Sequence, residues 1–462
     1  MLHQMRCVVG VMLTAVLLAA VAACAARPEG VLAPITGTHA GASQVEMVVA
    51  TTRTPAASPG EMFTGERGHT PNFAEITVSI PPKSARRIGE VAWPRRLPPN
   101  PATDFAAVEA RIVSQEDAVA WFHEEVAKKP NRSVLIFVHG FNNRFEDAVF
   151  RFAQIVHDSG VQSLPILVTW PSRGSALAYG YDHESTNYSR NSLELLLQYL
   201  ARDPAVGEVS ILAHSMGNWL TLEALRQMAI RNGRLPAKFK NVMMAAPDVD
   251  VDVFRSQIAD MGTPRPDFTL FVSRDDRALA VSRKVWGSVA RLGAIDPEVE
   301  PYKTVLATNQ VTVIDLTAIA AGDKIHHSKF AESPQIVQLI GTRLATGQPL
   351  TDSRVGIGEQ IVSATAGAAS AVGTAAGLVL AAPVAVVDPD TRAGYGERLE
   401  QMGLPAAEAN SLGSPSPAAC GGDPSRAPEF CGAQSPEAVG SGELPSNAPP
   451  PAGPENGASG SS

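Results

Sequence analysis

Short apolar runs recur through the middle of the chain, and most are followed by turn residues and then by a helix-like segment. Val134–Val138 is an unbroken apolar run, which is typical of a strand buried on both faces of a parallel sheet. Gln115–Lys128 carries its apolar residues on one face at helical spacing. Alternating strands and helices predict an α/β fold with a mostly parallel central sheet and helices on both faces. The other predicted strands of this sheet are Ile166–Trp170, Val209–Ala213, Asn241–Ala246, Phe268–Val272 and Val311–Leu316.

Three further strands are predicted before this alternation begins. They are Val45–Thr51, Ile76–Ile80 and Phe105–Val113, each with apolar or alternating character. Between the first two lies Arg53–Phe73, which is rich in Gly, Pro and Thr and is predicted to be irregular, with a turn at Gly65–Gly68. We interpret this region as an extension of the main sheet and not as a separate domain.

The chain begins with the pattern of a secretory signal. Arg6 is followed by an apolar run, Val8–Ala22, and then by small residues. The ending Val21-Ala22-Ala23-Cys24 resembles the lipobox of bacterial lipoproteins, in which the peptide is cut before a cysteine that is then lipidated. An ordinary cleaved signal with an incidental cysteine is the alternative. We expect export to the bacterial cell envelope, with the chain anchored in the membrane through Cys24 and facing the periplasm.

Composition divides the rest of the chain. Residues 24–43 are predicted to be a flexible tether, 44–350 the globular domain, and 401–462 a disordered Pro/Gly/Ser-rich tail. Residues 351–400 are rich in Ala and Gly, and 361–387 carry no charge. That stretch could cross a bilayer, but Ala and Gly insert weakly, so a helix lying on the membrane or packed on the surface is favoured.

Charge and composition exclude some classes of function. The net charge of −8 and the pI of about 5.7 argue against broad nucleic-acid binding, which needs a basic face. We find no cluster of His, Cys, Asp and Glu at metal-ligand spacing, so neither a metal nor a cofactor is expected. Cys420 and Cys431 could form a disulfide in an exported protein.

One serine lies where a predicted strand meets a predicted helix, in Ala213-His214-Ser215-Met216-Gly217. A serine on such a sharp turn exposes its hydroxyl, and small residues two before and two after it let the backbones approach. Gly217 meets this need, whereas Ala213 replaces the usual first glycine. The motif is weak alone, because Ser215 could simply cap the following helix.

Groups that could assist this serine follow other predicted strands. Gly140 lets the loop after Val134–Val138 turn, which would aim the Phe141 N–H above the nucleophile, and Met216 would supply a second oxyanion donor. A triad also needs a carboxylate and then a histidine after late strands. The residues alone leave open three carboxylates and two histidines: Asp248, Asp275, Asp276, His326 and His327.

Aromatic and polar residues suggest a wall around this site. Tyr179 opens a segment dense in such residues before a predicted helix at Ser192–Leu200, and the segment could be a substrate-facing wall or an exposed loop. A pocket lined by Phe141, Trp170, Tyr179 and Trp219 would favour an acyl chain or an aromatic ester. The residues that we assign to substrate binding are His139, Gly140, Trp170, Tyr179 and His214.

Taken in order, six motifs from about residue 45 to about residue 344 resemble the α/β-hydrolase family DUF900. The resemblance implies Ser215 as nucleophile, His327 as base because Ser-Lys-Phe follows it, and Asp276 as acid because Arg-Ala-Leu follows it, with Asp248 as the alternative acid. The motifs are His139–Asn143, Trp170–Ser172, His214–Gly217, Ala246–Asp248, Ser273–Leu279 and His327–Phe330.

The resemblance also implies an α/β-hydrolase fold and a serine hydrolase that works through an acyl-enzyme without a cofactor. Its expected substrate is a small-molecule or lipid-like ester, and acyl transfer to an acceptor other than water is open on the same residues. The competing interpretation is an envelope lipoprotein that uses the fold as a binding or scaffold module. Membrane contact through the anchor is expected in either case.

Overall fold

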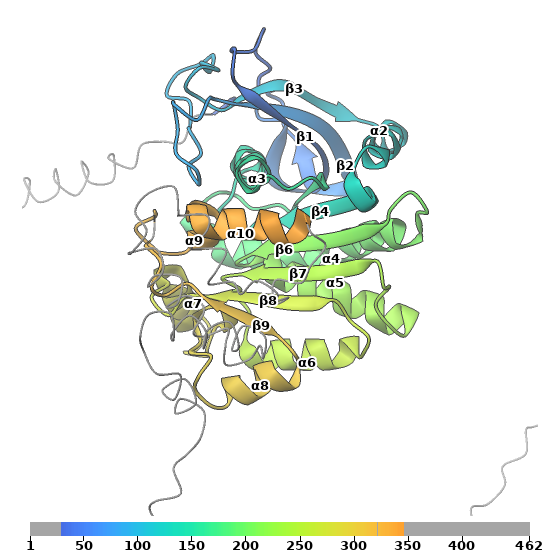
Figure 1. The fold of residues 1–462 in the computed structure, drawn as a ribbon, viewed down its shortest axis with the longest axis vertical. Helices are drawn as coiled ribbons and strands as arrows, with labels where there is room; N and C mark the ends of the chain where they lie inside the picture. Colours follow the sequence, from blue (N-terminus) through green and yellow to red (C-terminus); the bar gives the residue numbers. More distant parts are fainter. Residues whose placement is uncertain (1–28, 321, 346–462) are drawn as a thin grey trace, which may run out of the picture. The chain divides into compact units, whose positions relative to one another are not determined.

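Nine strands form one sheet in the computed structural model, which describes residues 29–320 and 322–345 (Figure 1). Their order is β3-β2-β1-β5-β4-β6-β7-β8-β9, and all neighbours pair in parallel except β1 with β2 and β2 with β3. The mostly parallel sheet expected from the sequence is therefore confirmed. The strands are β1 (Ser43–Pro55), β2 (Phe63–Ile80), β3 (Ala106–Val113), β4 (Ser133–Val138), β5 (Leu164–Thr169), β6 (Glu208–His214), β7 (Phe239–Ala245), β8 (Asp267–Val272) and β9 (Thr312–Asp315).

Helices cover both faces of this sheet (Figure 1). In β4, Val134, Ile136 and Val138 belong to one core, whereas Leu135 and Phe137 belong to the other. This alternation explains why the strand is apolar throughout. The first core is covered by α2 (Gln115–Ala127), α4 (Tyr179–Arg202), α5 (Gly217–Asn232), α6 (Val251–Met261) and α8 (Tyr302–Thr308), and the second by α3 (Phe145–Ser159), α9 (Lys329–Glu332) and α10 (Pro334–Ala345).

The segments that carry the candidate site residues follow the carboxyl ends of the parallel strands. Among them are the short helices η2 (Ala176–Ala178) and α7 (Arg277–Val285), which follow β5 and β8. The loop after β9 leads into α9. Because the carboxyl ends of parallel strands meet at one edge, these loops lie together in space.

The turn predicted at Gly65–Gly68 is wrong, and of the segment predicted to be irregular only residues 56–62 lie outside strands. β1 continues to Pro55 and β2 begins at Phe63, so Gly65–Gly68 is part of a strand. The two glycines are needed for close packing and not for turning. A Cβ at Gly65 would lie 2.7 Å from the Cα of Arg173, and one at Gly68 would lie 2.9 Å from the Arg53 carbonyl oxygen.

Two more boundaries differ from prediction. α4 begins at Tyr179, well before the predicted start, because polar residues on its buried face hide the helical periodicity: Asp182, Ser185, Thr186 and Ser189 are all buried. The prediction of a flexible tether is wrong at Val31 and Leu32, whose side chains are fully buried in the domain.

Several predictions fall outside the described residues. They are the signal at 1–23, lipidation at Cys24, the Ala/Gly-rich segment at 351–400, the tail at 401–462 and the cysteines Cys420 and Cys431. Over residues 29–320 and 322–345, no helix has the length and apolar character needed to cross a bilayer.

Candidate active site

Ser215 lies on a strained turn between β6 and α5. Its φ of +51° is in the left-handed region, and its backbone N–H donates to the Ala245 carbonyl at 2.9 Å. Gly217 has no room for a side chain, because a Cβ there would lie 2.4 Å from the His139 carbonyl oxygen. The alanine at position 213 is accommodated with its side chain fully buried. This is the geometry that a nucleophile elbow requires.

The loop after β4 approaches this turn closely. A Cβ on Gly140 would lie 2.9 Å from the Ser215 Cβ and 3.0 Å from His214 Nδ1, so only glycine fits. Within the described part of the chain, the N–H groups of Phe141 and Met216 have no hydrogen-bond partner. Both belong to segments that flank Ser215, which leaves them available to an oxyanion.

Asp276 is hydrogen-bonded to His327. The His327 Nδ1–H donates to Asp276 Oδ2 at 2.6 Å, while Asp276 Oδ1 accepts the Leu279 N–H at 2.9 Å and so caps α7. Burial favours the neutral imidazole, but the hydrogen bond and charge of Asp276 outweigh it and raise the pKa of His327. With its proton on Nδ1, His327 has Nε2 free to accept another.

Ser215 and His327 line the same cavity, although no hydrogen bond joins them in the described residues. Catalytic hydrogen bonds are often long or unformed without substrate. His214 helps to place the histidine loop, since its Nε2–H donates to the His327 carbonyl at 3.3 Å. Burial, and then the charge of His327, lower the pKa of His214 well below the ordinary value, so it is neutral.

The two other candidate acids have different partners. Asp248 accepts hydrogen bonds from the hydroxyls of Tyr179 and Ser282, each at 2.6 Å, and lies 3.3 Å from Arg291 Nε. Burial and the nearby Asp248 charge raise the pKa of Tyr179. Asp248 therefore orients a tyrosine of the cavity wall, and among the described residues no hydrogen bond joins it to His327.

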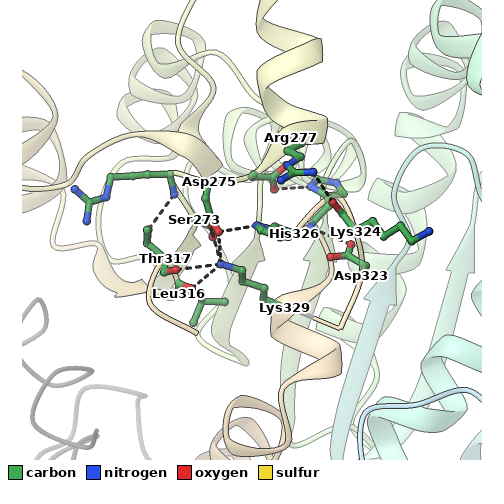
Figure 2. Close-up of polar contacts among 12 residues, drawn as sticks. Ser273, Asp275, Arg277, Leu316, Thr317, Asp323, Lys324, His326 and Lys329 are labelled. Carbon is green, nitrogen blue, oxygen red and sulfur yellow. Dashed lines mark hydrogen bonds and ion pairs between the residues drawn. The ribbon is translucent and has the colours of Figure 1, made fainter. Parts of the chain in front are cut away.

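Asp275 holds the adjacent histidine and a buried lysine (Figure 2). His326 Nδ1 lies 2.7 Å from Asp275 Oδ2, and Lys329 Nζ donates to both carboxylate oxygens at 2.8 and 3.0 Å. Lys329 Nζ also donates to the Leu316 and Thr317 carbonyls. Burial tends to raise the pKa of Asp275, but the hydrogen bonds, first from Lys329, lower it to about 2. This network ties the histidine loop to the segments after β8 and β9.

Ser215 opens into a cavity of about 540 Å³. Of the five residues predicted to bind substrate, His139, Tyr179 and His214 line it, whereas Gly140 and Trp170 do not. Phe141 also lines it. Its lining also includes apolar residues that the sequence did not suggest, among them Leu279, Val281, Val285 and Ile325.

Trp170 and Trp219 do not line the cavity, so the predicted apolar wall is wrong in these two positions. Trp170 is fully buried and stacks on the His139 ring with centroids 4.7 Å apart. Its indole N–H donates to the His139 carbonyl at 2.9 Å. Through these contacts with His139, Trp170 supports the loop that carries Gly140.

Arg53 is a site residue that the sequence did not reveal. It is fully buried, and its guanidinium donates to the carbonyls of Ser172 and Asn143, each at 2.9 Å. Its Nη2 also lies 3.4 Å from His139 Nε2. Burial lowers the pKa of Arg53 to about 10. The pKa of His139 is lowered to about 3, mainly by burial and secondly by the charge of Arg53. Arg53 thereby joins the loops after β4 and β5.

Residues 114–343 match the family model described as an α/β-hydrolase of unknown function, DUF900. These residues are a DUF900 α/β-hydrolase domain. The matched segment begins just after β3, so the DUF900 domain receives Arg53 from a strand outside it.

Two other comparisons give more distant similarities. The uncharacterized protein alr1448 of Nostoc sp. (strain PCC 7120) is 23% identical over 151 residues, which cover 27% of this chain and only 39% of that relative. A solved structure assigned as a cell surface hydrolase from Lactobacillus plantarum WCFS1 is 13% identical, with a TM-score of 0.30. The match covers 47% of this chain and 92% of that one.

Proposed function

We propose that the protein is a serine hydrolase that cleaves ester-type substrates through Ser215, His327 and Asp276. The observation that carries the proposal is the buried Asp276–His327 hydrogen bond at the cavity into which the Ser215 turn opens. Membership of an α/β-hydrolase family supports the same reaction class.

In the proposed reaction, His327 Nε2 takes the proton of the Ser215 hydroxyl while Oγ attacks the carbonyl carbon. The carbonyl electron pair moves to oxygen, and the N–H groups of Phe141 and Met216 stabilise that negative charge. Collapse of this intermediate breaks the ester bond, and His327 gives its proton to the leaving alkoxide. Water, deprotonated by the same histidine, then releases the acid from Ser215.

The cavity favours a carboxylic ester with an apolar acyl or aromatic group. Its lining combines Phe141 and Tyr179, which pack edge to face with centroids 5.0 Å apart, with the aliphatic side chains of α7. An apolar substituent gains from leaving water in such a site. A panel of p-nitrophenyl esters tests this preference, and equal kcat/KM across all acyl lengths would contradict it.

We also propose that the protein is exported and anchored at Cys24 in the bacterial envelope, facing the periplasm. The signal-like sequence pattern ending at Cys24 supports this. Cells expressing the full chain are expected to incorporate labelled palmitate into it, and Cys24→Ser should abolish incorporation. Incorporation that survives this change would contradict the assignment of the anchor.

Labelling with a fluorophosphonate probe tests the activity. The full-length protein is expected to react at Ser215, and Ser215→Ala and His327→Ala should abolish the reaction. His326→Gln is the matched control, because it changes the neighbouring histidine and should keep most of the labelling. A folded wild-type protein that does not react would instead favour a binding module.

A further inference from the structure

Apolar side chains stand exposed around the mouth of the active-site cavity. Leu177 in η2 is 99% exposed, Val281 and Val285 on α7 are 62% and 60% exposed, and Ile325 after β9 is 48% exposed. The last three also line the cavity, and Leu177 adjoins the lining residue Ala176. These four exposed side chains are the apolar rim.

The rim is not explained by packing within the described domain. On α7, Leu279 and Ser282 are buried, whereas Val281 and Val285 point away from the core. Single exposed apolar residues are ordinary, but several gathered around one opening mark a surface that contacts something apolar. Three separate chain segments contribute to the rim, so it depends on the fold and not on one apolar stretch.

Basic side chains surround the rim. Arg277, Arg283, Lys284 and Lys324 are exposed, and within residues 29–320 and 322–345 none of them forms an ion pair. Residues 277–295 contain no acidic residue, although the chain as a whole carries a net charge of −8. Unpaired cations beside exposed apolar side chains complement a partner that is apolar in its interior and negatively charged at its surface.

We propose that the apolar rim and its four cations dock the protein on an anionic lipid surface, with the cavity mouth against the lipid. The rim would enter the boundary between headgroups and acyl chains, and the cations would contact the headgroups. Each such cation strengthens binding about fivefold. The inference rests on the proposed function. With the cavity mouth against the lipid, a lipid-like ester would pass from the membrane into the cavity without crossing water.

Hydrogen–deuterium exchange on the full-length protein tests this docking without requiring activity. The protein is mixed with phosphatidylcholine vesicles that either contain phosphatidylglycerol or lack it. Exchange of residues 174–180 and 277–291 is expected to slow on the anionic vesicles only. Protection that is equal on both vesicle types, or absent on both, would overturn the proposal.

Charge-reversal variants identify the cause of the protection. Arg283→Glu combined with Lys284→Glu should remove it, while turnover of a soluble short-chain ester stays unchanged because neither residue lines the cavity. The matched control is Arg202→Glu with Arg234→Glu. These two exposed residues lie at the carboxyl end of α4 and two residues beyond that of α5, so their reversal should keep the protection.

Two results would assign the rim to another occupant and overturn the proposal. Residues 346–462 carry more acidic than basic side chains. If the rim is already protected without vesicles, and deletion of residues 346–462 removes this protection, that segment is the occupant of the rim. Protection that appears only as protein concentration rises would identify a second copy. The proposed hydrolase can fail separately, since Ser215→Ala should abolish probe labelling and leave vesicle protection intact.

Discussion

Replacing Asp276 by Asn should separate catalysis from stability. Asp276 Oδ1 accepts the Leu279 N–H at 2.9 Å, and Oδ2 accepts from His327 at 2.6 Å. The Leu279 N–H can only donate, so it will take the amide oxygen of the introduced asparagine and turn the NH₂ toward His327. The histidine must then carry its proton on Nε2, where it can no longer accept the Ser215 proton.

The two effects differ greatly in size. Asn caps helices about as well as Asp, so the free energy of unfolding should change by only about 0.5 kcal/mol from the cap. Loss of the required tautomer should lower kcat by about 10⁴-fold, or ~5.5 kcal/mol in the barrier. Ester hydrolysis and urea unfolding of the same preparations measure the two quantities.

The pH dependence follows from the same pair. Since Asp276 raises the pKa of His327, kcat/KM should fall as pH drops through a value above that of an ordinary histidine. The raised pKa also means that the Asp276–His327 pair stabilises the fold fully below the unfolded-state pKa of His327 and progressively less as pH rises through its folded-state pKa.

The assignment of Asp276 as the acid of the triad can be refuted directly. An Asp276→Asn enzyme with near wild-type kcat would refute it, especially if Asp248→Asn is inactive.

Three further substitutions test the supports of the site. Gly140→Ala would place a Cβ 2.9 Å from that of Ser215 and should lower kcat about 100-fold. Its control is Gly180→Ala, since a Cβ at Gly180 would have nothing within 4 Å. This variant should keep kcat and raise the free energy of unfolding in urea by about 0.5–1 kcal/mol. Lys329→Met removes the donor to two carbonyls and should cost about 1–3 kcal/mol in urea unfolding; an unchanged midpoint would argue against the network. Arg53→Met should lower kcat about 10-fold or more at similar KM, with partial rescue by Arg53→Lys, and a rise in KM alone would contradict its role in positioning the loops.

The sequence predicted the elements that are specified locally. Unbroken apolar strands such as Val134–Val138 revealed the sheet, because burial on both faces demands apolar residues at every position. The family resemblance distinguished Asp276 from Asp248 and Asp275, and the structure brings Asp276 to His327. The residues alone left all three carboxylates open, because each follows a strand.

The rest depends on contacts between distant segments. Arg53 acts through carbonyls more than 80 positions away, and its surroundings in the sequence gave no sign of burial. Trp170, the last residue of a predicted strand, was expected in the cavity wall because it is a large aromatic residue, but its indole stacks on the His139 ring instead. The helical start at Tyr179 was missed because its buried face is polar, with Asp182 accepting from Ser172 and the Arg173 backbone.

The acyl-enzyme is the most direct test of the central claim. The full-length protein is mixed with a p-nitrophenyl ester, quenched in acid within the first turnover and digested for mass spectrometry. The account predicts that the peptide containing Ser215 gains the mass of the acyl group, and that Ser215→Ala shows neither the adduct nor hydrolysis. Hydrolysis by wild-type protein without an adduct at Ser215, at undiminished rate in Ser215→Ala, would contradict it.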